Sequence, residues 1–475
     1  MIHLVQNAIR KKRQYVAALV ANLAIACMGA SMAWTSPVES KLKNPAESPL
    51  STIPTATELS WIGSILTLGS LTGPTFAGLI AYRFGRKMAM LTSAAFYLSA
   101  YVLFLTATSV AQILVGRFVQ GCGIGFAITI TPMYVAEIAT VNRRGALGSL
   151  VQTYITLGLL FDYVIGPYVS YAAFQWIQMS LPVAFILTFI HMPETPHFYV
   201  SKGNYPAAAR SLAYIRGKPI GELQAEYNSI QFSVEESMRN RGSLKDLFRN
   251  HANFRALTIC TGVVVFQQLS GINPVQFFAQ TIFEKTGSGL PAELNAIIIG
   301  VFQVVASVVT ALIVDRVGRR PTLLVSAAGM CCSLSALGAY FYLDDSGSKA
   351  AGSLSFLPVV SLVAFCVMFC TGFGPIAWVL LGEMFAPNIK SLASSVVSSI
   401  CWTTSFFILF YFSALDVALG SHWLFWIFAI CCAMAFVFTY VFVVETKGLS
   451  LPEIQARLNE TAPVNGAEDG GVVKY

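Results

Sequence analysis

Charged residues are scarce in this sequence. Lys, Arg, Asp and Glu make up 11% of the 475 residues, whereas hydrophobic residues make up 55%. A soluble globular domain carries about 25% charged residues. The charges also fall in short runs, and these leave many apolar segments of about 20 residues, the length at which a helix crosses a bilayer. The composition therefore excludes an ordinary soluble protein and predicts an all-α polytopic membrane protein.

The chain also lacks the motifs of several function classes. Neither a GxxxxGK[ST] phosphate-binding run nor an HExxH run occurs, so neither an ATP-driven pump nor a metalloenzyme is supported. The ten cysteines show neither metal-ligand nor disulfide-framework spacing, and we interpret them as small apolar packing residues. The formal charge of +7 requires no nucleic-acid partner, because cytoplasmic loops of membrane proteins are basic. We expect a protein that is not an enzyme and holds no metal or cofactor.

Three short motifs occur twice, in the same order. Residues 83–87 match 316–320, Glu137 and Arg144 match Glu383 and Lys390, and residues 194–195 match 445–446. Such a repeat indicates two homologous halves of six spans each, with a site between the halves, which is a transporter architecture.

A change of composition separates the two halves. From residue 197 the chain becomes charged and polar, with scattered apolar residues that suit short amphipathic helices. We therefore predict a cytoplasmic N-terminus (1–13), a first six-helix half (14–196), cytoplasmic linker helices (197–254), a second six-helix half (255–445) and a cytoplasmic tail (446–475). Residues 36–57 are expected to form an external loop. Most basic residues then lie on the side of both termini, which the positive-inside rule makes cytoplasmic.

Polar residues interrupt the apolar stretch 262–283. Gln267, Gln268 and Asn273 lie near its centre, beside Gly271 and Pro274, which weaken a helix. Amides and free backbone carbonyls are tolerated at membrane depth where they line a cavity or are buried in protein. This pattern predicts a broken helix that lines a substrate site. The alternative is that the amides join helices within a packed bundle.

These features resemble those of the sugar porters of the major facilitator superfamily, over nearly the whole chain. The segments that carry the resemblance are residues 266–273 (FQQLSGIN), 315–320, 193–196 and 445–448. Residues 33–37, 61–64 and 372–376 look most like the branch of insect facilitated trehalose transporters. The resemblance implies the major facilitator fold, with 12 transmembrane helices. It also implies a monomer in the plasma membrane that transports trehalose or a hexose such as glucose, as a facilitative uniporter working by alternating access.

The resemblance places the sugar contacts on amide and indole side chains. They are Gln152, Gln267, Gln268, Asn273, Gln303, Trp378 and Trp402. Amides donate and accept hydrogen bonds to hydroxyls, and indoles stack on the apolar face of a sugar ring. The alternative role of each Trp is packing or anchoring at the lipid interface. Cys370 stands where many hexose uniporters have Glu, so the identity of the sugar stays open.

Charged residues at the cytoplasmic ends of the spans are expected to form an inner gate that latches the halves when the site faces outward. They are Arg86, Glu137, Arg144, Asp315, Arg319, Glu383 and Lys390. The alternative is that these charges only set the topology.

Two intramembrane charges bear on energy coupling. In proton-linked sugar porters an acidic residue of the first helix lies near the counterpart of Arg117, but the first span here offers only Ser31. We expect Arg117 to bond backbone carbonyls or a helix end. Asp162 lies about one turn from the outer end of its span, and we interpret it as a solvated or interface-paired carboxylate rather than a proton carrier. A proton-coupled sugar symporter and a sugar-sensing receptor on the same fold are the alternatives to the uniporter.

Overall fold

The computed structural model describes residues 13–140, 143, 147–239, 243–285, 290–348, 352–449 and 451–459, except for the side chains of Val314, Asp315 and Pro387. Within these residues, eleven helices are long and apolar enough to cross a membrane, and the structure contains no strand. A twelfth span is broken into a helix of 19 residues and two helices of six residues each. The all-α polytopic fold predicted from composition is confirmed.

The first half contributes six spans. They are α2 (Arg13–Ala33) with α3 (Thr35–Lys43), α4 (Ala56–Ser70) with η1 (Gly73–Ala77) and α5 (Gly78–Phe84), α6 (Arg86–Leu105), α7 (Val110–Ile138), α9 (Leu150–Ile165) with η3 (Gly166–Tyr168), and α10 (Tyr171–Phe189).

The second half repeats this plan. Its spans are the broken α15 (His251–Leu269), α16 (Ile272–Phe277) and α17 (Ala279–Glu284), then α18 (Ala292–Val317), α19 (Arg319–Asp345), α21 (Leu357–Thr371) with α22 (Phe373–Glu383), α23 (Pro387–Leu419) and α24 (Ser421–Phe442).

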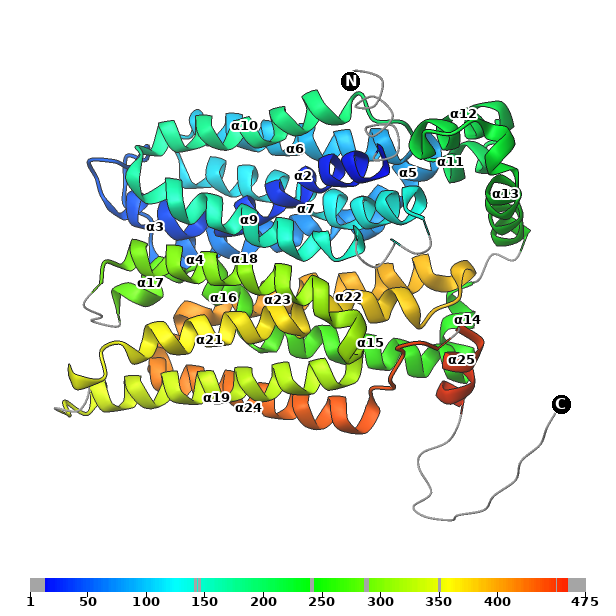
Figure 1. Ribbon diagram of the computed structural model, residues 1–475. Coiled ribbons are helices and arrows are strands. Elements are labelled where there is room, and N and C mark those ends of the chain that lie inside the picture. Colours follow the sequence, from blue (N-terminus) through cyan, green and yellow to red (C-terminus); the bar gives the residue numbers. More distant parts are fainter. Residues whose placement is uncertain are drawn as a thin grey trace, which may run out of the picture.

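The two halves lie one above the other in Figure 1, with their helices running in roughly the same direction. At their interface α9 packs against α18, and α4 packs against α23. A site between the halves is therefore bounded by spans of both.

Close approach of helices within the first half depends on glycine. A Cβ on Gly29 would overlap the carbonyl of Ile155, and one on Gly158 would overlap the carbonyl of Ala26. Because no larger residue fits at these two positions, α2 and α9 pack backbone against backbone. This contact holds α9, which faces the other half, in a fixed position.

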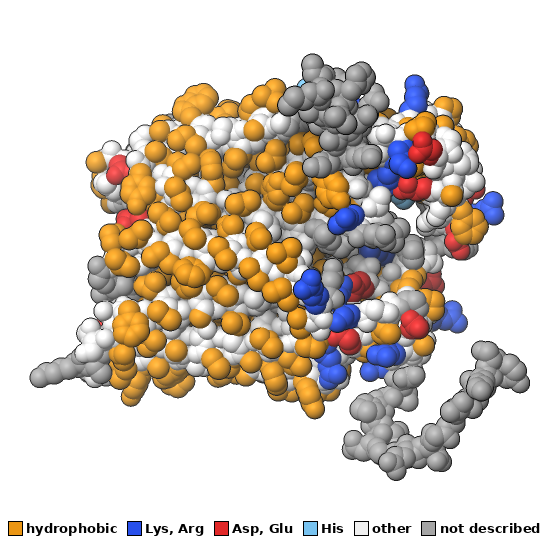
Figure 2. Space-filling model, viewed as in Figure 1, with side chains coloured by type: hydrophobic (Ala, Val, Ile, Leu, Met, Phe, Trp, Pro, Cys, Tyr) orange, Lys and Arg blue, Asp and Glu red, His pale blue; other side chains and the backbone are white. Residues whose placement is uncertain are grey.

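Within the part of the chain that the structure describes, six helices that belong to no span gather at one end of the bundle, which we call the linker end. They are α11 (Pro196–Ser201), α12 (Tyr205–Arg216), η4 (Ile220–Leu223), α13 (Gln224–Arg239), α14 (Leu244–Arg249) and α25 (Leu451–Asn459). Arg216 binds the Glu226 carboxylate and donates to the carbonyl of Ile138, so the linker is attached to the end of α7. Figure 2 shows Lys and Arg side chains gathered at this end, while the flank of the bundle is hydrophobic.

The expectation of an external loop over residues 36–57 is wrong in its first part. Residues Thr35–Lys43 continue the first span as helix α3, and Val38 and Leu42 are buried in the core. Pro37 caused the error, because proline is tolerated in the first turn of a helix, where its missing N–H is not needed. Thr55 then begins α4 with a capping box that Glu58 completes.

Candidate functional site

The break in the seventh span lies where the sequence predicted it. Helix α15 ends at Leu269, Gly271 takes φ +81°, and α16 begins at Ile272. A positive φ is easily reached only by glycine, so Gly271 turns the chain between the two helices. Asn273 therefore lies in the first turn of α16, close to the end of α15.

The three amides beside this break form one buried cluster. Asn273 donates to the Oε1 of Gln268, and Gln268 donates to the Oε1 of Gln267 over 3.3 Å. Gln267 donates to the backbone carbonyl of Phe373 over 2.7 Å and to that of Gly374 over 3.3 Å. The cluster thus joins the break in the seventh span to the start of α22.

Helix α22 follows a second break. Helix α21 ends at Thr371, and α22 starts at Phe373 after the non-helical Gly372. The break brings the carbonyls of Phe373 and Gly374 to the amide cluster. Amide side chains at membrane depth can donate hydrogen bonds to a polar ligand and accept hydrogen bonds from it.

Gln152 reaches the same place from the opposite half. It lies on α9, and its Oε1 is 3.2 Å from the position that a Cβ on Gly374 would take. Its amide nitrogen lies 3.9 Å from the Cys370 sulfur. Gln152 and Gln267 therefore approach the first turn of α22 from opposite halves.

Gln303 and Trp402 are buried without hydrogen-bond partners. Both polar atoms of the Gln303 amide and the indole N–H of Trp402 have no partner within the described residues. The Gln303 amide lies beside the Cys366 thiol, one turn before Cys370. A buried polar group without a partner costs about 1–3 kcal/mol, so these groups are available to a polar ligand. Trp378 is half-buried one turn after Gly374 and packs against the hydrophobic core.

The structure adds three residues that the sequence did not single out as contacts. Gln268 donates to the Cys401 sulfur over 3.1 Å, Asn273 donates to the Ser405 hydroxyl, and Gln152 approaches Cys370 as described. The interpretation of all ten cysteines as packing residues is therefore incomplete. One signal was present in the sequence: Cys401 precedes Trp402, and Ser405 follows it by three residues, on the same helix.

Hydrogen bonds tie the two halves together toward the end opposite the linker end, which we call the far end. The Tyr163 hydroxyl donates to the Gln276 carbonyl over 2.7 Å, and the Gln280 N–H donates to the Ser36 hydroxyl over 3.1 Å. Thr156 and Ser307 share a hydrogen bond of 3.1 Å. These hydrogen bonds join α9 to α16 and α18, and the first span to α17.

Two matching networks lie at the linker end, one in each half. Arg86 binds Glu137 over 2.9 Å, and Thr195 donates to the other oxygen of Glu137. In the second half Arg319 binds Glu383 over 2.9 Å, and Thr446 donates to the other oxygen of that carboxylate. Each ion pair joins two residues of the same half: the first pair lies in the first half and the second pair in the second half.

A second carboxylate supports each network. Glu194 accepts from the backbone N–H groups of Lys87 and Thr195, and burial nevertheless raises the pKa of Glu194 above its ordinary value. Burial also acts to raise the pKa of Glu445, but the N–H groups of Arg319, Lys447 and Arg320 outweigh it and hold that pKa below its ordinary value. The two halves thus share a geometry but differ in electrostatics.

Three other charged residues are expected in the inner gate: Lys390, Arg144 and Asp315. Lys390 donates to the Gly382 carbonyl over 2.8 Å. Arg144 and the side chain of Asp315 lie outside the described residues.

Arg117 bonds backbone carbonyls, as expected from the lack of an acidic residue in the first span. Its guanidinium donates to the carbonyl of Ile62 over 3.1 Å and to that of Ser31 over 2.8 Å. It also donates to the Thr35 hydroxyl over 2.9 Å and lies 5.0 Å from the Trp34 ring centroid.

The interpretation of Asp162 as a solvated carboxylate is wrong. Asp162 has 0% of its surface exposed and accepts a hydrogen bond from Gln178 of α10. Its distance from the helix end suggested contact with water, but α10 covers this part of α9. Packing between helices, which periodicity does not reveal, buries the carboxylate.

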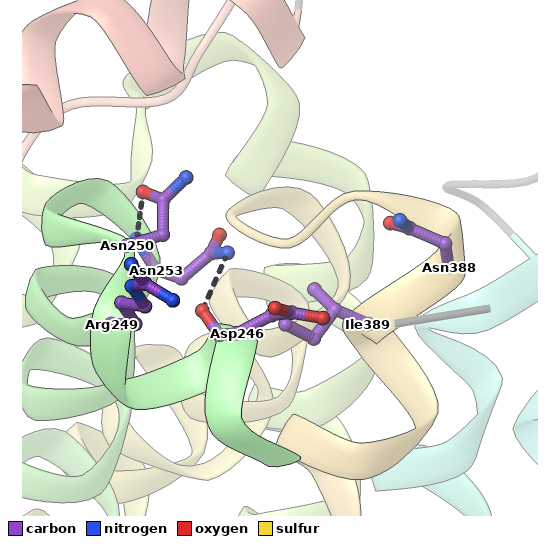
Figure 3. Close-up of a pocket in the computed structure, with 6 residues that line it drawn as sticks. All are labelled: Asp246, Arg249, Asn250, Asn253, Asn388 and Ile389. Carbon is purple, nitrogen blue, oxygen red and sulfur yellow. Dashed lines mark hydrogen bonds between the residues drawn. The ribbon is translucent and has the colours of Figure 1, made fainter. Parts of the chain in front are cut away.

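A pocket of about 330 Å³ opens at the linker end between α14, α15 and the start of α23. Figure 3 shows its lining: Asp246, Arg249, Asn250, Asn253, Asn388 and Ile389. None of the expected sugar contacts is among them. Asn250 caps α15 and Asn253 donates to the Asp246 carbonyl, so part of this polar lining already serves the local backbone.

Residues 14–458 match the family model described as "Sugar (and other) transporter". Proteins named facilitated trehalose transporter Tret1 from Culex quinquefasciatus and Apis mellifera ligustica are each 33% identical to the chain. The matches cover 94% and 95% of the chain, and 86% and 89% of those proteins. The Tret1 of Anopheles gambiae is also 33% identical, but there the match spans only 56% of the relative's length.

Solved structures share the fold. The major facilitator superfamily proton:xylose symporter XylE, bound to 6-bromo-6-deoxy-D-glucose, superposes with a TM-score of 0.78 at 24% identity, covering 95% of this chain and 100% of that one. A partially occluded inward-open form of XylE from E. coli gives a TM-score of 0.76 at 24% identity, over 93% of this chain and 100% of the other. The major facilitator fold is thereby confirmed.

Proposed function

The chain belongs to the sugar (and other) transporter family, and on that premise we propose that it carries a neutral sugar across the membrane by facilitative alternating access. The observation that carries the proposal is the meeting of Gln152 and Gln267, from opposite halves, at the first turn of α22. A ligand bound there contacts both halves, so its binding responds to their relative position.

The chemistry of this cluster favours a sugar. Its side chains are amides, a hydroxyl, thiols and an indole, and none is a carboxylate or a cation. Amides can donate and accept at once, as sugar hydroxyls require, whereas a charged substrate would need a counter-charge. We propose Gln152, Gln267, Gln268, Asn273, Gln303, Trp378 and Trp402 as the sugar contacts, with Cys370, Cys401 and Ser405 beside them. Trehalose is the first candidate substrate because the relatives are named for it, and a hexose is the second.

The linker-end networks are proposed to form the inner gate. Arg86, Glu137, Arg319 and Glu383 hold the ends of the spans in place within each half. Arg144, Asp315 and Lys390 are proposed to complete the gate. The basic residues at this end support its placement in the cytoplasm, together with both termini of a monomer in the plasma membrane.

Uptake by the purified protein in liposomes tests the function. A panel of labelled sugars that includes trehalose, glucose and fructose should show saturable entry of at least one sugar that stops at equal concentrations inside and outside. Entry no faster than that into protein-free liposomes, for every sugar, would contradict the proposal.

Proton-coupled symport is the second candidate, because Asp162 is a buried intramembrane carboxylate. It is separated from the amide cluster, however, and faces Gln178 within the first half. An imposed pH gradient distinguishes the two functions. Under uniport the sugar does not accumulate, whereas symport would give accumulation that a protonophore abolishes and that Asp162→Asn removes.

A further inference from the structure

The first half contains two charged side chains buried far from water. Arg117 on α7 and Asp162 on α9 are the only charged side chains with 0% exposure among the described residues. A single buried charge in a membrane span is costly, and an opposite charge reduces the cost. The two groups make no direct hydrogen bond, so their connection has to run through other side chains.

Three side chains connect them in one continuous chain. Arg117 donates to the Gln120 Oε1 over 2.6 Å, and the Gln120 amide donates to the Tyr101 hydroxyl over 3.3 Å. The Tyr101 hydroxyl donates to the Gln178 Oε1 over 3.3 Å, and the Gln178 amide donates to Asp162. We call these three residues, Gln120, Tyr101 and Gln178, the bridge.

Every hydrogen bond of the bridge points the same way. Each donor lies on the Arg117 side and each acceptor on the Asp162 side. A cation at one end and an anion at the other polarise such a chain in the same sense, which strengthens each bond. The direction of the hydrogen bonds therefore fits an ionised carboxylate at the Asp162 end of the bridge.

Only one oxygen of Asp162 accepts a hydrogen bond from the described residues, because Oδ2 is buried and has no partner there. Within these residues, the carboxyl group is therefore hydrogen-bonded by Gln178 alone, at the end of the bridge. The titratable side chains that face Asp162 are Tyr101 and Tyr163, and the guanidinium of Arg117 is the cation nearby.

The bridged pair touches each of the six spans of the first half that the structure describes. Arg117 and Gln120 belong to α7, Tyr101 to α6, Gln178 to α10 and Asp162 to α9. Arg117 also binds Ser31 and Thr35 of the first span and the Ile62 carbonyl of α4. No other hydrogen-bond network described above reaches all six spans of a half.

We propose that Asp162 is the counter-ion of Arg117, that Gln120, Tyr101 and Gln178 bridge the pair, and that this bridged ion pair fixes the six spans of the first half to one another. Asp162 is thereby a positioning residue. One consequence rests on the proposed function: during transport the buried charges of the first half stay neutralised internally, and no proton is taken from either side.

A double-mutant cycle tests the pairing without any transport assay. Arg117→Gln and Asp162→Asn should each lower the thermal unfolding midpoint in detergent, because each leaves the other charge unbalanced. The double variant should lose less than the sum of the two single losses. The matched control combines Arg117→Gln with Asp416→Asn, whose carboxylate pairs with Lys285 instead, and there the losses should add. Additive losses in the Arg117/Asp162 cycle would overturn the proposal.

Infrared spectroscopy of the wild-type protein keeps the test decisive if Arg117→Gln does not fold. At neutral pH the difference spectrum between wild type and Asp162→Asn should contain carboxylate bands and no protonated-carboxyl band. A protonated-carboxyl band assigned to Asp162 would overturn the proposal.

Tyr101→Phe tests the bridge. It removes the central hydroxyl and changes no charge, so it should lower the thermal unfolding midpoint of the wild type by more than it lowers the midpoint of the double variant. Equal effects would show that the bridge does not link the two charges. Absence of sugar uptake would contradict the proposed function and leave these results unaffected.

Discussion

Glu137 and Glu383 occupy equivalent positions in two copies of one hydrogen-bond network. Each accepts from an arginine that follows a glycine turn, at 2.9 Å, and from a threonine that follows a glutamate. The order of these residues repeats along the chain, so the internal repeat of the sequence corresponds to a repeated three-dimensional structure. Each network joins the ends of spans that are distant in sequence.

The first prediction concerns the equivalence of these two carboxylates. Glu383→Gln removes the charge while keeping the shape, and should weaken the linker-end contacts by about 1.5–3 kcal/mol, the value of a hydrogen bond to a charged group. Since these contacts are proposed to belong to the inner gate, the variant should populate inward-facing forms more. Labelling of single cysteines placed in the inner vestibule measures the shift.

Glu137→Gln provides the comparison. Its side chain is 14% exposed, against 30% for Glu383, so its effect should be at least as large. Unchanged labelling in both variants would mean that the networks only hold each half together and do not gate.

The second prediction concerns the amide cluster. Gln268→Ala removes the group that accepts from Asn273 and donates to Gln267 and Cys401. It should weaken sugar binding by about 1–3 kcal/mol, because polar partners are left unpaired. Sugar-dependent quenching of tryptophan fluorescence in the folded protein measures the affinity.

Gln112→Ala is the matched control for this substitution. Gln112 is also a glutamine in a span, but it bonds Leu103 and Thr106 at the far end of α7. Its loss should leave the sugar affinity unchanged. An affinity equal to that of wild type in folded Gln268→Ala would remove Gln268 from the site.

The third prediction concerns a glycine at the linker end. Gly85 takes φ +104°, and a Cβ there would overlap the Glu194 carboxylate. Gly85→Ala should therefore cost about 1–3 kcal/mol for the backbone conformation, which is accessible almost only to glycine, plus the displacement of Glu194 from the Lys87 N–H. The thermal unfolding midpoint should fall.

Gly203→Ala separates these two contributions. Gly203 takes φ +69°, but nothing lies within 4 Å of the position of an added Cβ. This variant should show the cost of a positive φ without any overlap. If Gly85→Ala loses no more than Gly203→Ala does, then the contact between Gly85 and Glu194 contributes nothing to stability.

The fourth prediction concerns pH. The pKa of Glu445 is held below its ordinary value, mainly by backbone N–H groups acting against burial. A carboxylate with a lowered folded-state pKa contributes stability that is complete above its unfolded-state pKa of about 4.3 and is lost as the pH falls through the folded value. The midpoint of the wild type should thus decline below about pH 4.5 partly through Glu445.

Glu445→Gln should make that decline less steep while lowering the midpoint at pH 7. The pKa of Glu194 is raised by burial, so Glu194→Gln should have the opposite effect on the pH dependence: its removal takes away a group that favours the folded state as the pH falls. If the midpoints of the two variants depended on pH in the same way, this would contradict the opposite pKa shifts of Glu194 and Glu445.

The sequence by itself determined the class of the protein, the two halves and the break at Gly271. The length of an apolar segment acts through the surrounding lipid, and glycine and proline act through the local backbone. None of these effects depends on residues that are distant in the sequence. For the same reason the sequence pointed to the amides of 267–273, because uncharged polar groups at membrane depth require partners whatever the fold.

The tertiary structure decided which partners they have. It placed Gln152 beside Gly374, although they are 222 residues apart (374 − 152), and it brought Cys401 and Ser405 to the amides of the seventh span. It also buried Asp162 under α10 and joined it to Arg117 through three side chains, which lie on α7, α6 and α10. Periodicity shows that a residue shares a helical face with its neighbours, but only the packing of helices decides what that face meets.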